Sequence, residues 1–265
     1  MLEIILLIGF LALTIWAFCT NLIWGLIVLV VLGIYFYVKR YSRLCISLAL
    51  QNYAKGDING CFRWYERAYN HGMDVQQKIT YAYYLMREGR VERSENLLNA
   101  VLAFPLKPEL KYKAKSNHAV LLLKTGRRLE ATEELEEIFP YFKNTNTYGS
   151  LGYLYILNGN LIKAKEFNFE AYEYNKDDVV ILDNMVQLHI ALRDYESAYQ
   201  YVTELMAKES RFIEAYYNAA LVEKELGKFE DAKVHLTHAL TIRTTFMSSV
   251  SHEEAQALLD SLPTF

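Results

Sequence analysis

The chain has few residues of the types that interrupt helices or form disulfide bonds. Among its 265 residues there are four prolines, twelve glycines and three cysteines. All four prolines stand where a helix is expected to have ended already, so they are compatible with a largely helical chain. Cys19, Cys45 and Cys61 have no spacing typical of a disulfide framework or a metal site. An oxidising compartment is therefore not indicated.

Motifs that carry catalysis are missing as well. The sequence has no phosphate-binding loop, no Gly-x-Ser-x-Gly and no metalloprotease histidine pair. Of the six histidines, only His235 and His238 are spaced to share a helix face, and beyond Asp231 no further metal ligand stands near them. The acidic run at 133–137 is typical of a solvated helix face. We expect a protein that is not an enzyme and that needs no cofactor or metal.

Apolar residues concentrate at the start of the chain. Two runs, IILLIGFLALTIWAFC and LIWGLIVLVVLGIYFYV, lie almost back to back. One helix over residues 2–38 would measure about 55 Å, well beyond a hydrocarbon core of about 30 Å. Two short transmembrane helices, about 2–18 and 22–38, fit better, turning near Asn21. Residues 1–41 are thus predicted to be a membrane anchor, with a single span as the alternative.

Charged residues next to these runs indicate an orientation. Lys39, Arg40 and Arg43 follow the second run, and cytoplasmic flanks of membrane helices carry the excess of basic residues. The start MLE has no basic residue and no small-x-small cleavage site follows, which disfavours a secretory signal. We therefore expect an integral protein of the cell membrane, with both termini and the rest of the chain facing the cytoplasm.

Beyond residue 41 the sequence repeats itself with a period of 34. Ala164, Ala198 and Ala232 are each 34 residues apart, and Gly159 and Gly227 are separated by two such periods. The recurrence defines six units over residues 42–246, which begin near residues 42, 75, 112, 145, 179 and 213.

Small residues recur at two positions of each unit. The eighth position is small in five units: Ala49, Ala82, Ala119, Gly152 and Ala220, with Val186 as the exception. The twentieth position holds Cys61, Ser94, Ala131, Ala164, Ala198 and Ala232. Small side chains at both places allow two antiparallel helices to approach closely. Each unit is therefore predicted to be a tightly packed helix pair.

The pattern resembles the tetratricopeptide repeat family, most closely in AYYNAALVEKELGKFEDA and TYGSLGYLYILNGNLIKAKEF. The resemblance covers essentially residues 42–246 and implies an all-α solenoid of six helix pairs. We therefore expect an N-terminal transmembrane helical hairpin followed by this α-solenoid and a capping helix.

Both ends of the solenoid need covering, because a stack of repeats otherwise exposes apolar edges. Residues 247–265 are predicted to form the C-terminal cap, since Ser251 and Glu254 make a capping box. Its apolar stripe consists of Ala255, Leu258, Leu259 and Leu262. At the other end no Gly or Pro occurs between Gly33 and Gly56. The second membrane helix is therefore expected to continue into the first repeat.

The resemblance also implies a concave groove that is lined by the first helix of each unit. The positions that face it are Tyr53, Tyr83, Met86, Arg87, Lys113, Lys124, Tyr153, Ile156, Gln187, Tyr217 and Lys224. Aromatic and flexible apolar groups beside a few charges suit a protein or peptide partner. Whether the tyrosines bind or only pack between repeats is open at this point.

Charge divides the chain into two halves. Residues 39–128 carry 17 Lys and Arg against 7 Asp and Glu, whereas residues 129–265 carry 11 against 23. Anionic lipid attracts basic segments that lie near a membrane. Candidate membrane-surface residues are Lys39, Arg40, Arg43, Lys111, Lys113, Lys115, Arg127 and Arg128. An acidic protein, including a second copy of the chain, is the alternative partner of this surface, and no nucleic acid is expected.

Together these patterns predict a non-enzymatic scaffold, tethered to the membrane, that docks protein partners in a repeat groove at the cytoplasmic surface. Two alternatives remain: a structural subunit of a multi-protein membrane complex, and a regulator of envelope assembly. The sequence does not identify the partner.

Overall fold

The computed structural model describes residues 2–263, without the side chains of residues 2–8, 36, 38 and 39. Within this range the chain forms fourteen α-helices and no strand. Its contacts divide it into two compact units, Met1–Gln77 and Lys78–Phe265, here unit 1 and unit 2. The predicted division at residue 41 lies inside a helix, and the contact boundary falls between Gln77 and Lys78.

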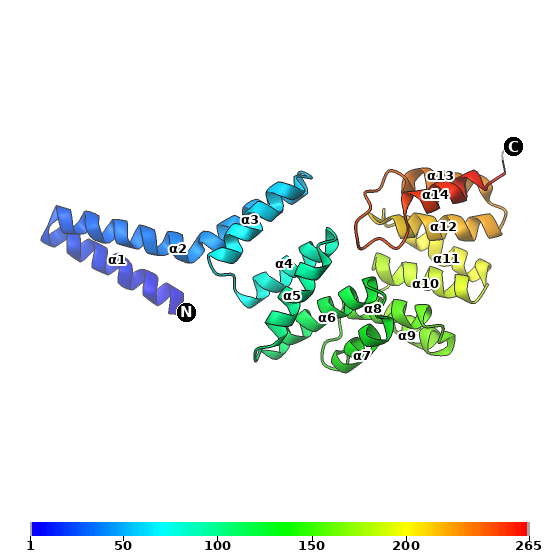
Figure 1. The fold of residues 1–265 in the computed structure, drawn as a ribbon, viewed down its shortest axis with the longest axis horizontal. Helices are drawn as coiled ribbons and strands as arrows, with labels where there is room; N and C mark the ends of the chain where they lie inside the picture. Colours follow the sequence, from blue (N-terminus) through cyan, green and yellow to red (C-terminus); the bar gives the residue numbers. More distant parts are fainter. Residues whose placement is uncertain (1, 264–265) are drawn as a thin grey trace. The chain divides into compact units, whose positions relative to one another are not determined.

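Unit 1 contains two long helices, α1 (Leu2–Thr20) and α2 (Leu22–Ala54), and the shorter α3 (Ile58–Asn70) (Figure 1). The break between α1 and α2 lies at Asn21, whose side chain accepts the Ile23 N–H at 2.8 Å and caps α2. The two helices pack closely there, since a Cβ atom at Gly25 would lie 2.3 Å from the Phe18 ring. The turn thus depends on the Asn21 cap and on the lack of a side chain at Gly25.

In the described part of the chain, no single helix is long and apolar enough to cross a membrane. Two arms of α2, Leu22–Tyr35 and Arg40–Ala54, reach the required length and composition only when taken together, and a bend of 50° separates them. The transmembrane segments expected at 2–18 and 22–38 therefore remain predictions. The second of them is part of a longer helix, because α2 continues to Ala54 as the lack of Gly and Pro predicted.

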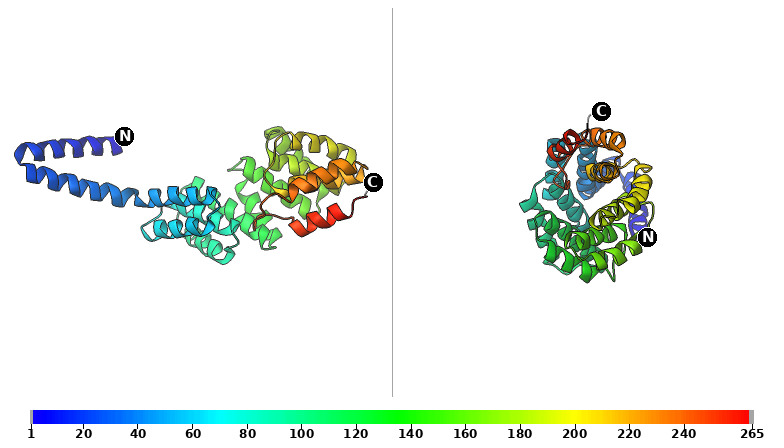
Figure 2. Two further views of the ribbon diagram at one scale, coloured as in Figure 1. Left: turned by 90° about the horizontal axis from the view of Figure 1, so that it is seen from above. Right: turned by 90° about the vertical axis from the view of Figure 1, so that its right-hand side faces the viewer.

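Unit 2 holds a series of helix pairs that follow one another along an arc (Figures 1 and 2). They are α4 (Val75–Arg87), whose first three residues belong to unit 1, α5 (Val91–Leu102), α6 (Pro108–Lys124), α7 (Arg128–Ile138), α8 (Thr145–Leu157), α9 (Leu161–Tyr174), α10 (Val179–Ala191), α11 (Tyr195–Met206), α12 (Ile213–Glu225) and α13 (Phe229–Ala239), followed by α14 (His252–Asp260). Four first helices begin at the expected residues 75, 145, 179 and 213. The helix α6 begins four residues before the expected 112, because Pro108 occupies the first turn, where proline fits.

The helix pairs pack through the small residues that the repeat pattern singled out, all of them buried. Ser94 donates its hydroxyl to the Ala82 carbonyl at 2.7 Å, and Asn168 donates to the Gly152 carbonyl at 3.1 Å. Backbone and side chain thus meet directly across each of these pairs, which leaves no room for a larger residue.

Turns inside the pairs use the left-handed backbone region. Gly159 and Gly227 have φ values of +73° and +72°, which glycine adopts without steric cost. The pair formed by α10 and α11 lacks this glycine, and Arg193 takes the same place with a φ of 57°. The backbone turn is therefore retained even where the sequence signal for it is missing.

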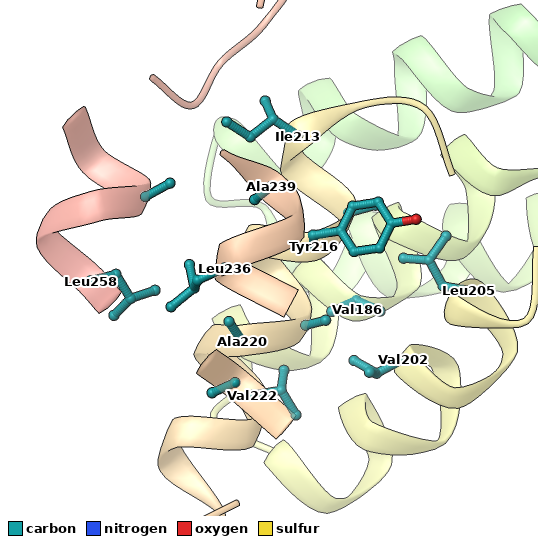
Figure 3. Close-up of a cluster of buried hydrophobic side chains, with 14 of the residues drawn as sticks. Val186, Val202, Leu205, Ile213, Tyr216, Ala220, Val222, Leu236, Ala239 and Leu258 are labelled. Atoms are coloured by element: carbon teal, nitrogen blue, oxygen red, sulfur yellow. The ribbon is translucent and has the colours of Figure 1, made fainter. Parts of the chain in front are cut away.

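The last helix, α14, covers the end of the helix pairs. Ser251 and Glu254 make the capping box that begins α14. Leu258 of α14 lies against Leu236 of α13 in the largely aliphatic cluster that fills the last helix pairs (Figure 3). Ala255 and Leu262 belong to the same buried cluster. The apolar end of the repeat stack is thereby covered.

Candidate functional site

A pocket of about 350 Å³ lies in unit 2 between the first helices of consecutive pairs and the loop that follows α13. We call it the concave pocket. Its walls come from α4, α6, α8 and α10, from the start of α12 and from residues 243–249. Its lining includes Tyr83, Arg87, Lys124, Tyr153, Asp183, Gln187, Glu214, Arg243 and Ser249.

Five of the eleven side chains expected to face a groove line this pocket: Tyr83, Arg87, Lys124, Tyr153 and Gln187. They come from four different helices, α4, α6, α8 and α10. The helix-pair repeat brings them together, although up to 104 residues separate them in the sequence. Binding of a partner by these residues stays a prediction.

The other six lie elsewhere. Met86 is fully buried, so it cannot face a groove, and the expectation for this residue is wrong. Ile156 and Tyr217 pack, partly buried, against core clusters. Lys113 forms an ion pair with Glu109 at 2.7 Å, and Lys224 donates to Ser261 at 3.2 Å. The sixth, Tyr53, is half-buried in α2 of unit 1.

The pocket contains a buried carboxylate that the sequence analysis did not identify. Asp183 on α10 is only 4% exposed. Its two oxygens accept from Asn218 Nδ2 at 2.9 Å and from Gln187 Nε2 at 2.7 Å. Burial raises the pKa of Asp183 to about 7, against the two hydrogen bonds and with a contribution from nearby Glu214. The available signal was a lone acidic residue within the largely apolar segment VVILDNMV.

Glu214, at the start of α12, is a second carboxylate in the same wall. It accepts hydrogen bonds from the Ser249 N–H and, at 3.1 Å, from the Ser249 hydroxyl. Burial lowers the pKa of Lys124, and the charge of Glu214 opposes this shift. Burial also raises the pKa of Tyr153, whose hydroxyl is hydrogen-bonded to Ser249. The pocket thus combines cations, carboxylates and aromatic rings in a partly dehydrated environment.

The loop after α13 closes one side of the pocket. We call residues 241–250 the strap. At one end Ser249 is held by Glu214, and at the other Arg243 Nη2 lies 2.5 Å from Glu88 Oε2. Between them the Phe246 N–H donates to the Arg87 carbonyl at 3.1 Å. The predicted repeats end at residue 246, inside this loop, and helix periodicity carried no signal for its contacts.

In the part of the chain that the structure describes, no group of three or more His, Cys, Asp or Glu side chains is placed to hold a metal ion. His235 Nδ1 lies 2.8 Å from Glu223 Oε2, whereas the His238 ring packs 4.3 Å from the Tyr216 ring. The His235 ring also lies 6.0 Å from the Tyr216 ring, so the two histidines share this aromatic neighbour.

Several basic residues predicted to meet lipid are paired within the protein. Lys115 lies 2.5 Å from Glu137, and Arg127 contacts Glu130 at 2.6 Å and Glu95 at 3.0 Å. Four others, Arg40, Arg43, Lys111 and Arg128, are exposed, and the side chain of Lys39 lies outside the described residues. The sequence count of basic residues therefore overstates the charge that is available on this surface.

Comparison with protein families gives a match to the tetratricopeptide repeat over residues 213–246. A curated relative, the TPR repeat-containing protein YvcD of Bacillus subtilis (strain 168), is 26% identical over 117 residues. The alignment covers 44% of this chain and 24% of YvcD, so the chain spans about a quarter of that relative.

Solved structures share the fold at low sequence identity. The thermophilic TPR protein TTC0263 of Thermus thermophilus has a TM-score of 0.58 at 17% identity, covering 71% of this chain and 98% of its own. The pilF protein of Pseudomonas aeruginosa has a TM-score of 0.57 at 16% identity, covering 83% and 98%. These matches support the tetratricopeptide repeat resemblance, and the fold is an all-α helical repeat solenoid.

Proposed function

We propose that the concave pocket docks an extended segment of a protein partner and that the chain is a non-enzymatic docking scaffold. Tetratricopeptide repeat proteins mediate protein–protein interaction, and the fold of this chain matches theirs. The observation that carries the proposal is the convergence of Tyr83, Lys124, Tyr153 and Gln187, each from a different helix pair, on one pocket.

The dimensions and lining of the pocket favour a peptide segment. A volume of about 350 Å³ is at the lower end of the roughly 300 to 1,000 Å³ that ligand pockets usually have. It suits one or two side chains of a longer segment that continues along the concave surface. Aromatic rings beside charged and amide groups match the usual composition of peptide-binding surfaces.

Affinity purification of the full chain in mild detergent tests the proposal. We expect the double variant Lys124→Ala, Tyr153→Ala to lose proteins that co-purify with the wild type. The matched control is Ile162→Ala on α9, because this side chain is 78% exposed and does not line the pocket. Recovery of the same proteins at the same yield with the pocket variant, once its helical circular dichroism matches the wild type, would refute the proposal.

We further propose that the N-terminal segment tethers this scaffold to the cell membrane with unit 2 on the cytoplasmic side. Large apolar side chains on α1 and the first half of α2 are exposed, among them Leu11, Trp16, Ile23 and Trp24. Exposed apolar surface of this extent marks an interaction site with membrane or protein. The exposed Arg40 and Arg43 next to it support the cytoplasmic orientation.

The tether has its own test in intact cells or spheroplasts. We expect the full chain to stay in the membrane fraction during alkaline extraction, and externally added protease to leave unit 2 intact until the cells are lysed. A matched variant with three aspartates in place of Ile23, Leu26 and Val30 should shift to the extract. Release of the wild type by alkali, or cleavage of unit 2 before lysis, would contradict the proposal.

A structural subunit of a membrane complex is the second candidate, and a regulator of envelope assembly is a special case of the scaffold. One feature favours the subunit. Open space surrounds Gly9 and Gly33, so a second helix would approach each backbone closely. A subunit should lose its partners when Gly9 and Gly33 are changed to Leu, whereas a docking scaffold should lose them when the pocket is changed.

We also propose two further interactions of this chain, contact with lipid and self-association. The exposed Lys111 and Arg128 support contact with anionic headgroups. The excess of acidic residues over 129–265 is the corresponding argument for pairing with a second copy.

A further inference from the structure

We propose that the concave pocket binds an acidic segment of a protein partner together with one proton, and that Asp183 takes up this proton and hydrogen-bonds, as a neutral carboxyl group, to an acceptor oxygen of the segment. This inference rests on the proposed docking function and specifies the chemistry of the docked segment. It also makes docking depend on pH, with tighter binding at pH 6 than at pH 8.

Asp183 lies in the pocket wall and is held only by neutral groups. Its side-chain oxygens accept from Asn218 Nδ2 of α12 and from Gln187 Nε2, one turn further along α10. Among the described residues no basic side chain forms an ion pair with it. A carboxyl group that is 4% exposed and lacks a cation is costly in its charged form. The neutral form is therefore favoured once the pocket is filled.

The neutral carboxyl group keeps both hydrogen bonds and gains a donor. Each carboxyl oxygen has room for more than one hydrogen bond, so protonation leaves the bonds from Asn218 and Gln187 intact. In the described part of the chain these two amides are the only hydrogen-bond partners of Asp183. The O–H of the neutral form is therefore free to donate to an acceptor in the pocket, which is how buried, neutral carboxylic acids act in other sites.

The titratable groups that face Asp183 come from α8 and α12. From α12 the Glu214 carboxylate, itself held by Ser249, adds a like charge. From α8 the phenol of Tyr153 has a pKa that burial raises. Burial, with the added charge of Glu214, raises the pKa of Asp183 to about 7. A small change in the surroundings of Asp183 therefore changes its charge near neutral pH.

The other helices that pack against α10 contact a different residue. The rings of Phe169 on α9 and Tyr201 on α11 lie against His189. Burial lowers the pKa of His189, and the charge of Asp194 opposes this shift. His189 does not line the concave pocket, so its titration is common to the wild type and to a variant of Asp183.

The rest of the lining favours an acidic segment. The basic side chains of the pocket outnumber the acidic ones: Arg87, Lys124, Arg211 and Arg243 against Asp183 and Glu214. Burial lowers the pKa of Lys124, so this ammonium group has lost water and gains from an incoming carboxylate. Arg211 is exposed, and among the described residues it forms no ion pair. Charge complementarity of this kind selects the partner and orients it.

A docked acidic segment raises the pKa of Asp183 further. It excludes water from the pocket and brings negative charge, and both effects disfavour the charged carboxylate. Binding and proton uptake are therefore linked. Because the segment binds the neutral form, the apparent affinity follows the neutral fraction of Asp183. With a pKa of about 7 this fraction is about 90% at pH 6 and about 10% at pH 8, a roughly tenfold decrease.

The probe is a displayed library of random decapeptides, selected at pH 6 on the full chain in mild detergent and counter-selected on the variant Lys124→Ala, Tyr153→Ala. We expect the retained peptides to share an aspartate or glutamate at one position. One retained peptide is labelled with fluorescein and titrated by anisotropy at pH 6, 7 and 8. Its affinity for the wild type should fall about tenfold from pH 6 to pH 8.

Asp183→Asn is the decisive variant, because its amide stays neutral at every pH and has an N–H that can face the pocket. We expect it to bind the peptide at pH 8 about as tightly as the wild type does at pH 6. The control Asp231→Asn, at an exposed site on α13, should keep the pH dependence of the wild type. Calorimetric titration at pH 7, in two buffers of different ionisation enthalpy, should show uptake of about half a proton by the wild type and none by Asp183→Asn.

The outcomes separate this inference from the docking proposal. Three results would overturn the inference and leave docking intact: equal affinity of the wild type at pH 6 and pH 8, wild-type pH dependence in Asp183→Asn, or retained peptides that share no acidic residue. A library from which no pocket-dependent peptide is retained would overturn both proposals.

Discussion

Replacing Asp183 by Asn should stabilise the protein, and the gain should grow as the pH rises. The ordinary aspartate pKa of 3.8 applies to the unfolded chain, whereas burial raises the folded value to about 7. A carboxyl group with a raised folded pKa contributes its full stability below the unfolded pKa and loses it as the pH rises through the folded one. Stability due to Asp183 therefore falls between about pH 4 and pH 7.

The magnitude follows from the two pKa values. A difference of about three pKa units corresponds to roughly 4 kcal/mol above pH 7, at about 1.4 kcal/mol per unit. Between pH 5 and pH 8 the change amounts to roughly 2 to 3 kcal/mol, because part of the loss has already occurred at pH 5. In the Asp183→Asn variant the new amide oxygen still accepts from Asn218, and a rotated Gln187 amide accepts from the new NH₂ group. The hydrogen bonds are therefore retained without the buried charge.

Urea unfolding of the full chain, in one detergent at pH 5, 6, 7 and 8, measures this difference. The free energy of unfolding of Asp183→Asn relative to wild type should increase by roughly 2 to 3 kcal/mol from pH 5 to pH 8. The control Asp231→Asn, at an exposed site on α13, should show a constant difference across the same range. A flat difference for Asp183→Asn would show that the carboxyl is not dehydrated as described.

The remaining predictions concern the close approaches inside the helix pairs. Ala198→Leu adds three carbons at a fully buried contact and should lower stability by about 1 to 3 kcal/mol, whereas Ala207→Leu at an exposed position should not; equal melting temperatures for both would contradict the packing. Gly152→Ala should cost about 1 to 3 kcal/mol, because the added methyl group would lie 2.3 Å from Asn168 Oδ1 and force its buried amide away from the Gly152 carbonyl. Thermal unfolding followed by circular dichroism measures both, and an unchanged midpoint for Gly152→Ala would show that Asn168 moves freely.

The helix pairs were predictable because their signal is local and repeated. Ala164, Ala198 and Ala232 set the register of the repeats and allow the two helices of each pair to approach closely. The same pattern recurs in successive units, which strengthens the prediction. The same logic predicted the capping box at Ser251, since the pairing of a cap residue with the third residue of the helix depends on neighbouring residues. The start of α6 deviated because Pro108 extends that helix by four residues.

The site was less predictable because burial depends on neighbours in space. Met86 and Ile156 hold the same position in their units, yet one is fully buried and the other is only partly buried against its core cluster. Repeat position alone does not distinguish them, since the atoms that cover a side chain come from other helix pairs. The strap is the extreme case, because Arg243 meets Glu88 across 155 residues.

Site-specific photo-crosslinking in intact cells tests the central claim, that partners dock in the concave pocket, most directly. A photoreactive residue at Tyr153 lies in the pocket, and one at Ile162 lies on exposed surface outside it. We expect a discrete crosslinked product from position 153 and none from position 162. Equal products from both positions, or a product from position 162 alone, would contradict it.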